Sequence, residues 1–484
     1  MTQDGLEGFA MLYEKDLDSV LQEIVARWGI PGLAVGIVQD DEIVYAKGFG
    51  VQSLETQTPV TLESIFCVAS VSKAFVATAV VQLAERGKIN LDAPIVQYLP
   101  YFQLDDERYP QITIRQILSH TSGMPDMDES EYDELVAHPE WDDGAAERYV
   151  RRLSSRKLAA APGERFLYSN IAYNVLGDMI AKVSGKSFET TMKEHILIPS
   201  GMPNSTFLLE DVSRDLLAVP HLRTPEMSVS PLYPYHRADA PASFLHSTIL
   251  DMCHWGMTCL NRGSYQGQSI LSSASYEMMW TPVVEWGYPR PSLSEDMGLG
   301  WTLGHYNGTK TVSHGGMGFG WTDFLVILPE KKRAAVILCN EESFARSRTV
   351  RAVMDTMMEQ KPQANTVSWM VPISQALTEG GIQAACTRYA DIKNSAAQGY
   401  YFDEDELINL SIQLMTAKKL DLAIDVLGLN IHVFPEHVES YIERAKLYLQ
   451  KGEFAQAEES LLKALSIKPD STAAAELLEK VRLH

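Results

Sequence analysis

The chain has 484 residues, of which 45% are hydrophobic and 21% are charged. This composition is typical of a globular protein, and the length predicts two or three domains. The formal charge of −22 argues against nucleic acid or an anionic membrane surface as a partner. The five cysteines are scattered without a CxxC pair, and we find no signal peptide and no apolar run of about 18 residues. We therefore expect a cytoplasmic protein with reduced thiols and no membrane span.

Hydrophobic patterning predicts strands near both ends of a long first region. An amphipathic helix at 14–28 is followed by a strand hairpin at 32–39 and 42–51, a strand-like run at 64–70 and an apolar helix at 73–86. Residues 90–295 are helical, proline-rich and loop-rich, and further strands at 300–305, 311–314, 324–328 and 334–339 precede a helix at 343–359. This order predicts an α/β domain over 12–361, with an antiparallel sheet flanked by helices and a helical insert.

The remaining chain has a purely helical pattern with an internal repeat. Residues 362–403 are expected to form a linker and a helical connector. Beyond them, Leu420/Phe454, Ala423/Ala457 and Pro435/Pro469 are each 34 positions apart, the period of tetratricopeptide repeats. We expect repeats at 404–437 and 438–471 and a capping helix, so that 404–484 form a small all-α domain. An unrelated helical bundle is the alternative. Such repeats favour a protein partner or self-association.

The segment Ser70-Val-Ser-Lys73 carries the first chemical signal. A serine at the start of a helix, with a lysine one turn later on the same face, pairs a nucleophile with a candidate base. The helix N-terminus also stabilises an oxyanion. The same spacing occurs at Ser154–Lys157 and Ser460–Lys463, so the pattern alone is weak. Neither Gly-x-Ser-x-Gly nor His-Glu-x-x-His is present in the sequence.

Two later motifs complete a serine-hydrolase constellation. Tyr168-Ser-Asn170 contains the only Tyr-x-Asn among 20 tyrosines and follows a Pro-Gly turn at the start of a predicted helix. His314-Gly-Gly-Met317 ends a predicted strand with glycines that allow a ligand to approach the backbone.

With these motifs, residues 20–360 resemble the serine β-lactamase-like superfamily, which includes class C β-lactamases, related carboxylesterases and D-amino-acid-specific peptidases. Ile117-Leu-Ser-His-Thr-Ser-Gly-Met-Pro125 and Gly298-Leu-Gly-Trp301 support the resemblance. It implies a β-lactamase/transpeptidase-like domain. It also implies that Ser70 is the acylated nucleophile and that Lys73 and Tyr168 share the role of base.

The resemblance assigns three further positions. Asn170 would orient the substrate or Lys73, and the backbone N–H groups of Ser70 and Met317 would form the oxyanion hole. His314 stands where class C β-lactamases carry a lysine. A neutral histidine offers a hydrogen bond rather than a permanent charge for a carboxylate. This difference favours a small ester or amide over a β-lactam.

The expected function is therefore a serine hydrolase that forms an acyl-enzyme and cleaves a small carboxylic ester or amide. Nothing in the chain suggests a metal or an organic cofactor. A D-amino-acid-specific peptidase or a weak β-lactamase is the chemical alternative, and a catalytically vestigial scaffold that recruits partners through its repeats is the alternative of another class. We expect truncation after Lys361 to leave ester hydrolysis intact.

The stretch Asp126–Asp143 contains nine acidic residues and no lysine or arginine. One interpretation is a solvated loop or helix face. The other is an acidic rim near the cleft, including Asp126, Asp128 and Glu129, that attracts amine-bearing substrates.

Overall fold

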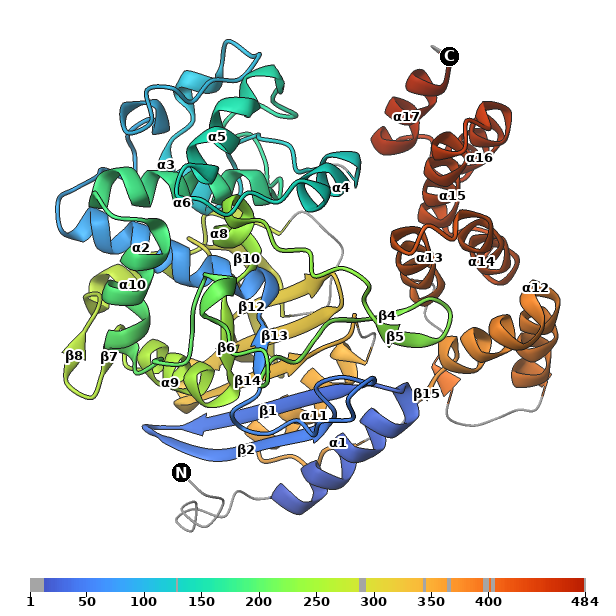
Figure 1. Ribbon diagram of the computed structural model, residues 1–484, viewed down its shortest axis with the longest axis horizontal. Helices are drawn as coiled ribbons and strands as arrows, with labels where there is room; N and C mark the ends of the chain where they lie inside the picture. The colour runs from blue at the N-terminus through green and yellow to red at the C-terminus, as the bar shows by residue number, and fades with distance from the viewer. Residues whose placement is uncertain are drawn as a thin grey trace. The chain divides into compact units, whose positions relative to one another are not determined.

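The computed structural model describes residues 13–127, 129–286, 293–342, 345–363, 367–394, 400–401 and 405–482. The chain divides into two compact units (Figure 1). The first contains residues up to 25, 30–220 and 230–363, and the second contains 26–29, 221–229 and 364–484.

The first unit is built on an eight-stranded antiparallel sheet with the order β2-β1-β14-β13-β12-β11-β10-β9. Its strands come from the two ends of the domain, as the sequence predicts. They are β1 (Gly32–Gln39), β2 (Glu42–Gly50), β9 (Val284–Glu285), β10 (Asp296–Met297), β11 (Thr302–Tyr306), β12 (Thr309–Gly318), β13 (Trp321–Leu328) and β14 (Arg333–Cys339). Every residue of β13 is buried, because helices cover both faces of the sheet.

The strand register shows which helices share a face with the end of β12. Across the sheet, Gly36 is the partner of Val336, Val336 of Leu325 and Leu325 of His314. Directly opposed residues point to the same side. A Cβ on Gly36 would lie 2.4 Å from Cys253 Sγ on α9 (Ile249–Leu260), so α9 and the His314 side chain occupy one face.

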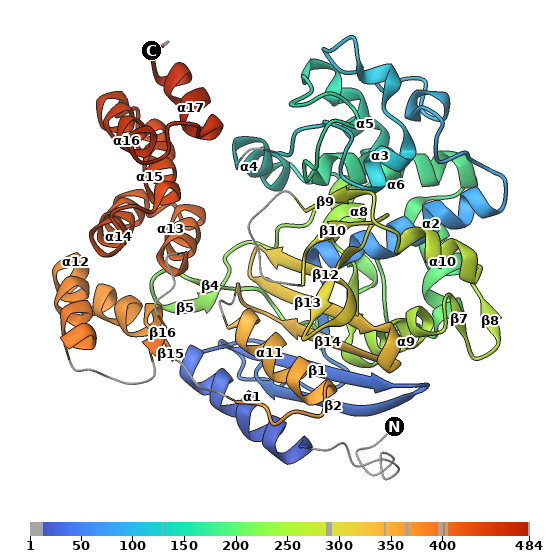
Figure 2. The ribbon, with the colours of Figure 1, turned by 180° about the vertical axis from the view of Figure 1, so that it is seen from behind.

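The other face is covered by α11 (Arg346–Met357). Successive residues of a strand alternate in direction, and a Cβ on Gly315 would lie 2.1 Å from the Arg346 guanidinium. The predicted helix at 343–359 is therefore confirmed over 346–357; residues 343–344 lie outside the described part of the chain. Figure 2 shows α11 and α1 (Glu14–Trp28) against the sheet from behind.

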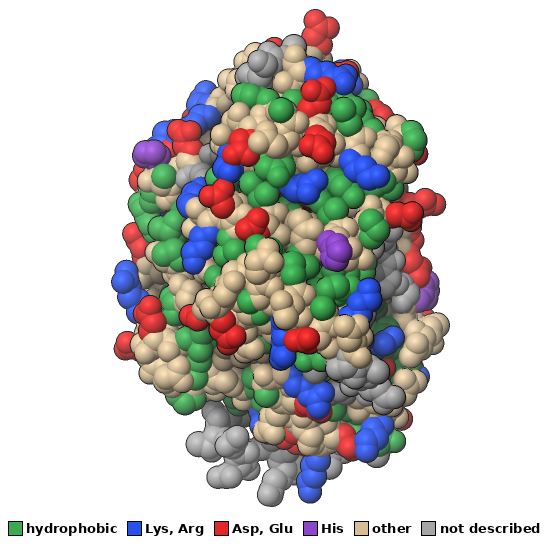
Figure 3. All heavy atoms as spheres, turned by 90° about the vertical axis from the view of Figure 1, so that its right-hand side faces the viewer, with side chains coloured by type: hydrophobic (Ala, Val, Ile, Leu, Met, Phe, Trp, Pro, Cys, Tyr) green, Lys and Arg blue, Asp and Glu red, His purple; other side chains and the backbone are tan. Residues whose placement is uncertain are grey.

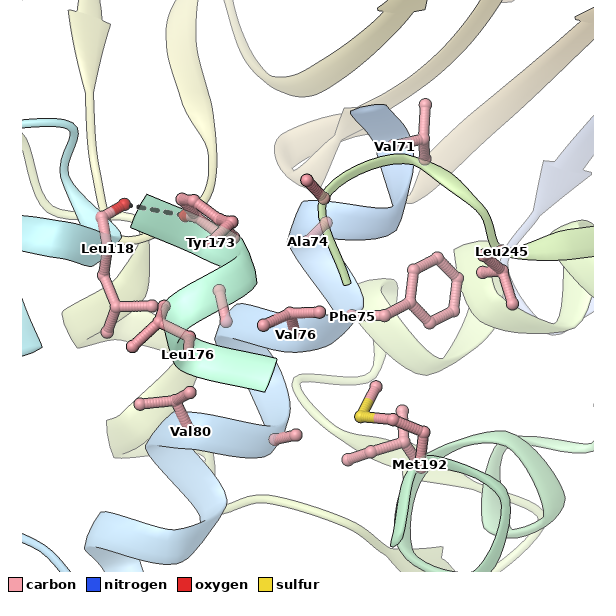
Figure 4. Close-up of a cluster of buried hydrophobic side chains, with 14 of the residues drawn as sticks. Val71, Ala74, Phe75, Val76, Val80, Leu118, Tyr173, Leu176, Met192 and Leu245 are labelled. Atoms are coloured by element: carbon pink, nitrogen blue, oxygen red, sulfur yellow. Dashed lines mark hydrogen bonds between the residues drawn. The ribbon is translucent and has the colours of Figure 1, made fainter. Parts of the chain in front are cut away.

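The helical insert packs around α2 (Ser72–Glu85), which is buried along nearly its whole length. Phe75 stacks on Trp255 of α9, with ring centroids 4.1 Å apart. Figure 4 shows α2 beside α6 (Asn170–Ser184), where the Tyr173 hydroxyl donates a 2.9 Å hydrogen bond to Leu118 O. The other insert helices are α3 (Ile114–Leu118), α4 (Glu129–Ala137), α5 (Ala145–Arg152), α7 (Phe188–Met192), α8 (Ala240–Ser243) and α10 (Ser273–Met279).

The strand-like run predicted at 64–70 forms a short strand outside the main sheet. Its strand, β3 (Ile65–Cys67), pairs antiparallel with β6 (His246–Thr248) in a separate two-stranded sheet. A short 3-10 turn, Ala69–Val71, then separates β3 from α2. Ser70 therefore lies on a turn between strand and helix rather than at the end of a sheet strand.

The second unit is mainly helical. Its helices are α12 (Met370–Asn394), which is interrupted at Gly380–Gly381, α13 (Glu406–Thr416), α14 (Leu420–Val433), α15 (Val438–Gln450), α16 (Phe454–Ile467) and α17 (Thr472–Arg482). The strands β15 (Val367–Ser368) and β16 (Tyr400–Tyr401) form a parallel pair. Ala445, Ala457 and Ala464 belong to one buried cluster shared by α15, α16 and α17, because small side chains allow paired helices to pack closely.

A hairpin from the middle of the chain also belongs to the second unit. The strands β4 (His221–Arg223) and β5 (Met227–Val229) pair antiparallel. The Arg223 backbone N–H donates a 2.6 Å hydrogen bond to Gln413 Oε1, and the Ser374 hydroxyl donates to Pro225 O. Leu222 is buried. The second unit is therefore discontinuous in sequence, which its helical repeat pattern does not reveal.

Charges of both signs are interspersed with hydrophobic side chains on the face drawn in Figure 3. No patch of one sign stands out there. Within the described residues, no helix combines the length and apolar character required to cross a lipid bilayer.

The discontinuous second unit changes the expected result of removing the repeats. A chain ending at Gln363 lacks Gln413, whose Oε1 accepts from the Arg223 N–H, and also lacks α13, which lies against β4. We expect the first unit in this fragment to unfold at a temperature roughly 5 °C lower than in the full chain, and the fragment to aggregate more readily. Thermal unfolding by circular dichroism measures the difference. The matched control replaces 221–229 in the same fragment with a Gly/Ser linker and should regain stability. Equal unfolding temperatures of the two fragments would show that the hairpin without its helical partners does not destabilise the fragment.

Candidate active site

Ser70 lies on the turn that joins β3 to α2 and is half-buried. Ala69 before it has φ of +42°, a backbone conformation that non-glycine residues rarely adopt. Such local strain often occurs at functional sites. Here the turn brings the Ser70 backbone N–H close to the sheet.

Three acceptors surround the side-chain amine of Lys73, which has no solvent exposure. Nζ donates to Ser70 Oγ at 2.9 Å, to Asn170 Oδ1 at 2.6 Å and to Ala242 O at 2.8 Å. Burial lowers the pKa of Lys73 to about 7, although the nearby Asp126 and Asp239 carboxylates oppose this shift. A neutral amine is thus available near neutral pH.

Tyr168 and His120 form an aromatic wall beside this amine. Lys73 Nζ lies 4.9 Å from the centroid of the Tyr168 ring. The His120 ring stacks on the same tyrosine ring, with the two centroids 4.2 Å apart. His120 is buried, with φ of +55°, and its Nδ1 accepts a 3.2 Å hydrogen bond from the Ser169 N–H. His120 therefore supports the Tyr168 ring.

The helix α6 begins inside the site. Ser169 is its N-cap, and its hydroxyl accepts from the Ala172 N–H while donating to Pro125 O at 2.8 Å. This cap satisfies a free backbone donor and fixes the helix start. As a result, Tyr168 and Asn170 are held in place on either side of the cap.

The strand β12 forms the opposite wall. A Cβ on Gly316 would lie 2.6 Å from Val68 O and 3.0 Å from Ser70 N, so only glycine permits this approach of strand and turn. The side chain of Met317, the next residue, is half exposed. The arrangement brings the sheet edge at Gly316–Met317 beside the Ser70 N–H, as an oxyanion hole would require.

His314 is a neutral residue in this setting. Its Nδ1 donates a 2.9 Å hydrogen bond to Gly315 O when that nitrogen carries the proton. Burial, together with Lys73, lowers the pKa of His314 to about 3. The imidazole therefore carries no charge near neutral pH, and Nε2 remains as a hydrogen-bond acceptor.

All six sequence-predicted positions are placed around one centre, formed by the Ser70 turn, the first turn of α2, the start of α6 and the end of β12. Two further participants carry no motif: the carbonyl of Ala242 and the carboxylate of Asp126. No sequence pattern indicates the first, since any residue has a carbonyl. The second directly follows the Thr-Ser-Gly-Met-Pro phrase.

Most acidic side chains that the structure describes in the acidic stretch have a partner, and Glu134 is exposed. Asp126 accepts hydrogen bonds from Asn170. Four others pair with arginines: Glu131 with Arg156, Glu140 with Arg148 and Arg152, Asp142 with Arg148, and Asp143 with Arg237. Asp128 lies outside the described residues, and the side chain of Glu129 is not described. These pairs neutralise much of the charge that would attract an amine.

The comparisons with known proteins agree with this geometry. The sequence profile of the Beta-lactamase family matches residues 17–355, and that of the tetratricopeptide repeat matches residues 438–471. The chain therefore belongs to the Beta-lactamase family, within the serine hydrolase superfamily, and carries a C-terminal tetratricopeptide repeat. The predicted fold is confirmed: a β-lactamase/transpeptidase fold followed by an all-helical region.

Relatives cover the same domain. "Beta-lactamase-like protein 2" of Dictyostelium discoideum is 32% identical over 278 residues, which is 56% of this chain and 49% of that protein. "Protein flp" of Staphylococcus aureus strain MW2 is 25% identical over 332 residues, 68% of this chain and 64% of that protein. The octameric penicillin-binding protein homologue from Pyrococcus abyssi superposes with a TM-score of 0.63 and 28% identity, over 75% of this chain and 80% of that one.

The close approach at Gly316 can be tested by adding one methyl group. Gly316→Ala should move β12 away from the Ser70 turn and lower the rate of covalent modification by a fluorophosphonate about a hundredfold, since a backbone N–H predicted to stabilise an oxyanion would be displaced. The control is Gly428→Ala in α14, where an added Cβ meets nothing within 4 Å. A wild-type rate in a folded Gly316→Ala protein would exclude a role for this contact.

Proposed function

We propose that this protein is a serine hydrolase that acts through an acyl-enzyme on Ser70 and cleaves a small carboxylic ester or amide. One observation carries the proposal: the set of acceptors around Lys73 Nζ. Ala242 O and Asn170 Oδ1 are both acceptors and cannot donate a hydrogen bond. When the amine loses one proton, its two remaining N–H groups stay with these acceptors and its lone pair faces Ser70 Oγ.

In the proposed acylation step, Ser70 Oγ attacks the substrate carbonyl carbon and its proton passes to Lys73 Nζ. The carbonyl oxygen becomes an oxyanion, which the backbone N–H groups of Ser70 and Met317 stabilise. Collapse of this intermediate breaks the bond to the leaving alcohol or amine, which takes the proton, with Tyr168 beside the path. Water then attacks the carbonyl carbon of the acyl-enzyme and gives a proton to Lys73 Nζ. Collapse of this second intermediate breaks the bond to Ser70 Oγ, which takes that proton back, and the carboxylic acid leaves.

The charge of the site supports a substrate without an obligatory carboxylate. A lysine in the position of His314 would offer a permanent cation, whereas this imidazole is neutral and, with Nδ1 donating to Gly315 O, its Nε2 can accept a hydrogen bond. An ester or amide with a neutral acyl group suits this surface. A D-amino-acid-specific peptidase or weak β-lactamase activity is the second candidate, favoured by the descriptions of the relatives as penicillin-binding and β-lactamase-like proteins.

A candidate of another class is a scaffold with a vestigial hydrolase domain. The tetratricopeptide repeat favours it, because such repeats mediate protein–protein contacts. The intact network at Lys73 argues against it. Burying a lysine costs folding free energy, and buried groups with a shifted pKa cluster at functional sites.

Covalent labelling distinguishes the hydrolase from the scaffold. Intact-mass measurement should show one fluorophosphonate adduct on the wild-type protein and none on Ser70→Ala, because the Lys73 amine beside Ser70 Oγ activates this hydroxyl. Ser154→Ala, which changes the serine of another Ser-x-x-Lys match, should be labelled like wild type. A folded wild-type protein that stays unlabelled would favour the scaffold.

Substrate preference tests the role of His314. On one preparation, a short-chain p-nitrophenyl ester should be hydrolysed faster than a D-amino-acid amide or a chromogenic cephalosporin. His314→Lys should shift the ratio of kcat/KM toward the carboxylate-bearing cephalosporin by roughly tenfold, because it introduces a cation. An unchanged ratio in a folded variant would show that the charge at position 314 does not determine the substrate preference.

A further inference from the structure

A carboxylate that lies outside the three motifs holds one of the site residues. Asp126 Oδ1 accepts hydrogen bonds from the backbone N–H groups of Met127 at 3.0 Å and Asn170 at 2.9 Å, and Oδ2 accepts from Asn170 Nδ2 at 2.9 Å. Both carboxylate oxygens are thus used as acceptors. Asn170 is gripped twice, once through its backbone and once through its side chain.

This grip determines which way the Asn170 amide faces. A carboxylate with only acceptors requires the Nδ2 end of the amide to face it. Oδ1 must then face the other way, toward Lys73 Nζ at 2.6 Å. We propose that Asp126 is a positioning residue: it fixes the orientation of Asn170 and thereby keeps the Lys73 amine aimed at Ser70. The proposal rests on the proposed function and names a residue that serves it.

An Asn170 amide turned by 180°, with Nδ2 and Oδ1 exchanged, would have the opposite effect on Lys73. With Nδ2 toward Lys73, a neutral amine would turn its lone pair to that donor and away from Ser70 Oγ. The serine would lose its base although every motif residue remained in place. The geometry of one hydrogen-bond chain, from Asp126 through Asn170 to Lys73, therefore controls the nucleophile.

The segment that carries Asp126 is itself fixed to the start of α6. The Ser169 hydroxyl donates to Pro125 O at 2.8 Å, next to the Asn170 contacts. A carboxylate at this end of a helix is also favoured by the helix dipole. Asp126 is therefore held in position from two sides.

The charges around Lys73 determine the expected pH dependence. The carboxyl groups of Asp126 and Asp239 face it, together with the neutral rings of His120 and His314. The centroids of the Tyr168 and Tyr173 rings lie 4.9 and 5.7 Å from Lys73 Nζ. Asp126 in turn faces Asp239 and Tyr149. Each carboxylate favours the protonated amine, so removing one should lower the pKa of Lys73 further.

The test compares Asp126→Asn with a charge-conserving swap. In Asp126→Asn, the new amide donates to Asn170 Oδ1 and reverses Asn170. In the double variant Asp126→Asn with Asn170→Asp, the new amide donates to the new carboxylate, whose other oxygen accepts from Lys73. The control is Asp178→Asn on α6, whose carboxylate accepts from the Tyr101 hydroxyl and not from Asn170.

The measured quantity is the second-order rate of fluorophosphonate acylation between pH 5 and 10. We expect the maximal rate of Asp126→Asn to fall by about tenfold to a hundredfold, with its acidic limb at lower pH than in wild type. The swap should recover most of the maximal rate, with its acidic limb at higher pH, because a carboxylate then adjoins the amine. Asp178→Asn should keep the wild-type rate and pH profile.

The outcomes separate the two proposals. If wild type is not labelled at Ser70, the proposed function fails. If wild type is labelled and Asp126→Asn keeps its rate and pH profile, the positioning role is overturned. A swap no faster than Asp126→Asn, or an equal loss in Asp178→Asn, would also overturn it. If Asp126→Asn fails to fold, the swap is compared with Asn170→Asp, which opposes two carboxylates; recovery in the swap supports the role, and no recovery overturns it.

Discussion

A lysine amine with no solvent exposure and three hydrogen-bond acceptors is the constraint on which this site depends. Desolvation makes the charged form of such a group expensive, so its pKa falls toward neutrality. The acceptors come from three segments far apart in sequence: the Ser70 turn, the start of α6 and the end of α8. Their convergence requires α2 to be buried between the insert helices and the sheet, which explains its nearly continuous apolar sequence.

The sheet contributes through close approach rather than through charge. His314 and Gly316 point to the face that carries α9 and the Ser70 turn, whereas Gly315 points to α11. A side chain at Gly316 would meet backbone atoms, whereas one at Gly315 would meet the Arg346 guanidinium, the end of a flexible side chain that can move aside. The steric requirement for glycine is therefore strict at Gly316 and weaker at Gly315.

The sequence predicts those parts of the site that depend on local geometry. Ser70 and Lys73 are one helical turn apart, and Tyr168 and Asn170 flank a cap, so short motifs suffice to find them. The carbonyl of Ala242 and the grip of Asp126 on Asn170 depend on long-range packing, and composition does not distinguish Asp126 from its acidic neighbours. For the same reason the strands at both ends of the first domain are predictable, but the pairing of β3 with β6 outside the main sheet is not. The hairpin at 221–229 shows the same limit, since its partners, such as Gln413, are nearly 200 positions away in sequence.

Charge balance links the buried lysine to the substrate. When the Lys73 amine is neutral, neither it nor the neutral imidazole of His314 provides a cation to hold an anionic substrate, while Asp126 and Asp239 face the same centre. Burial raises the pKa of Asp239, so this carboxyl group accepts a proton more readily than an exposed one. A carboxylate-bearing acyl group would meet acidic groups without a compensating cation from these residues. In the proposed mechanism a neutral acyl group meets no such penalty, and the desolvation that lowers the pKa of Lys73 therefore also disfavours anionic substrates.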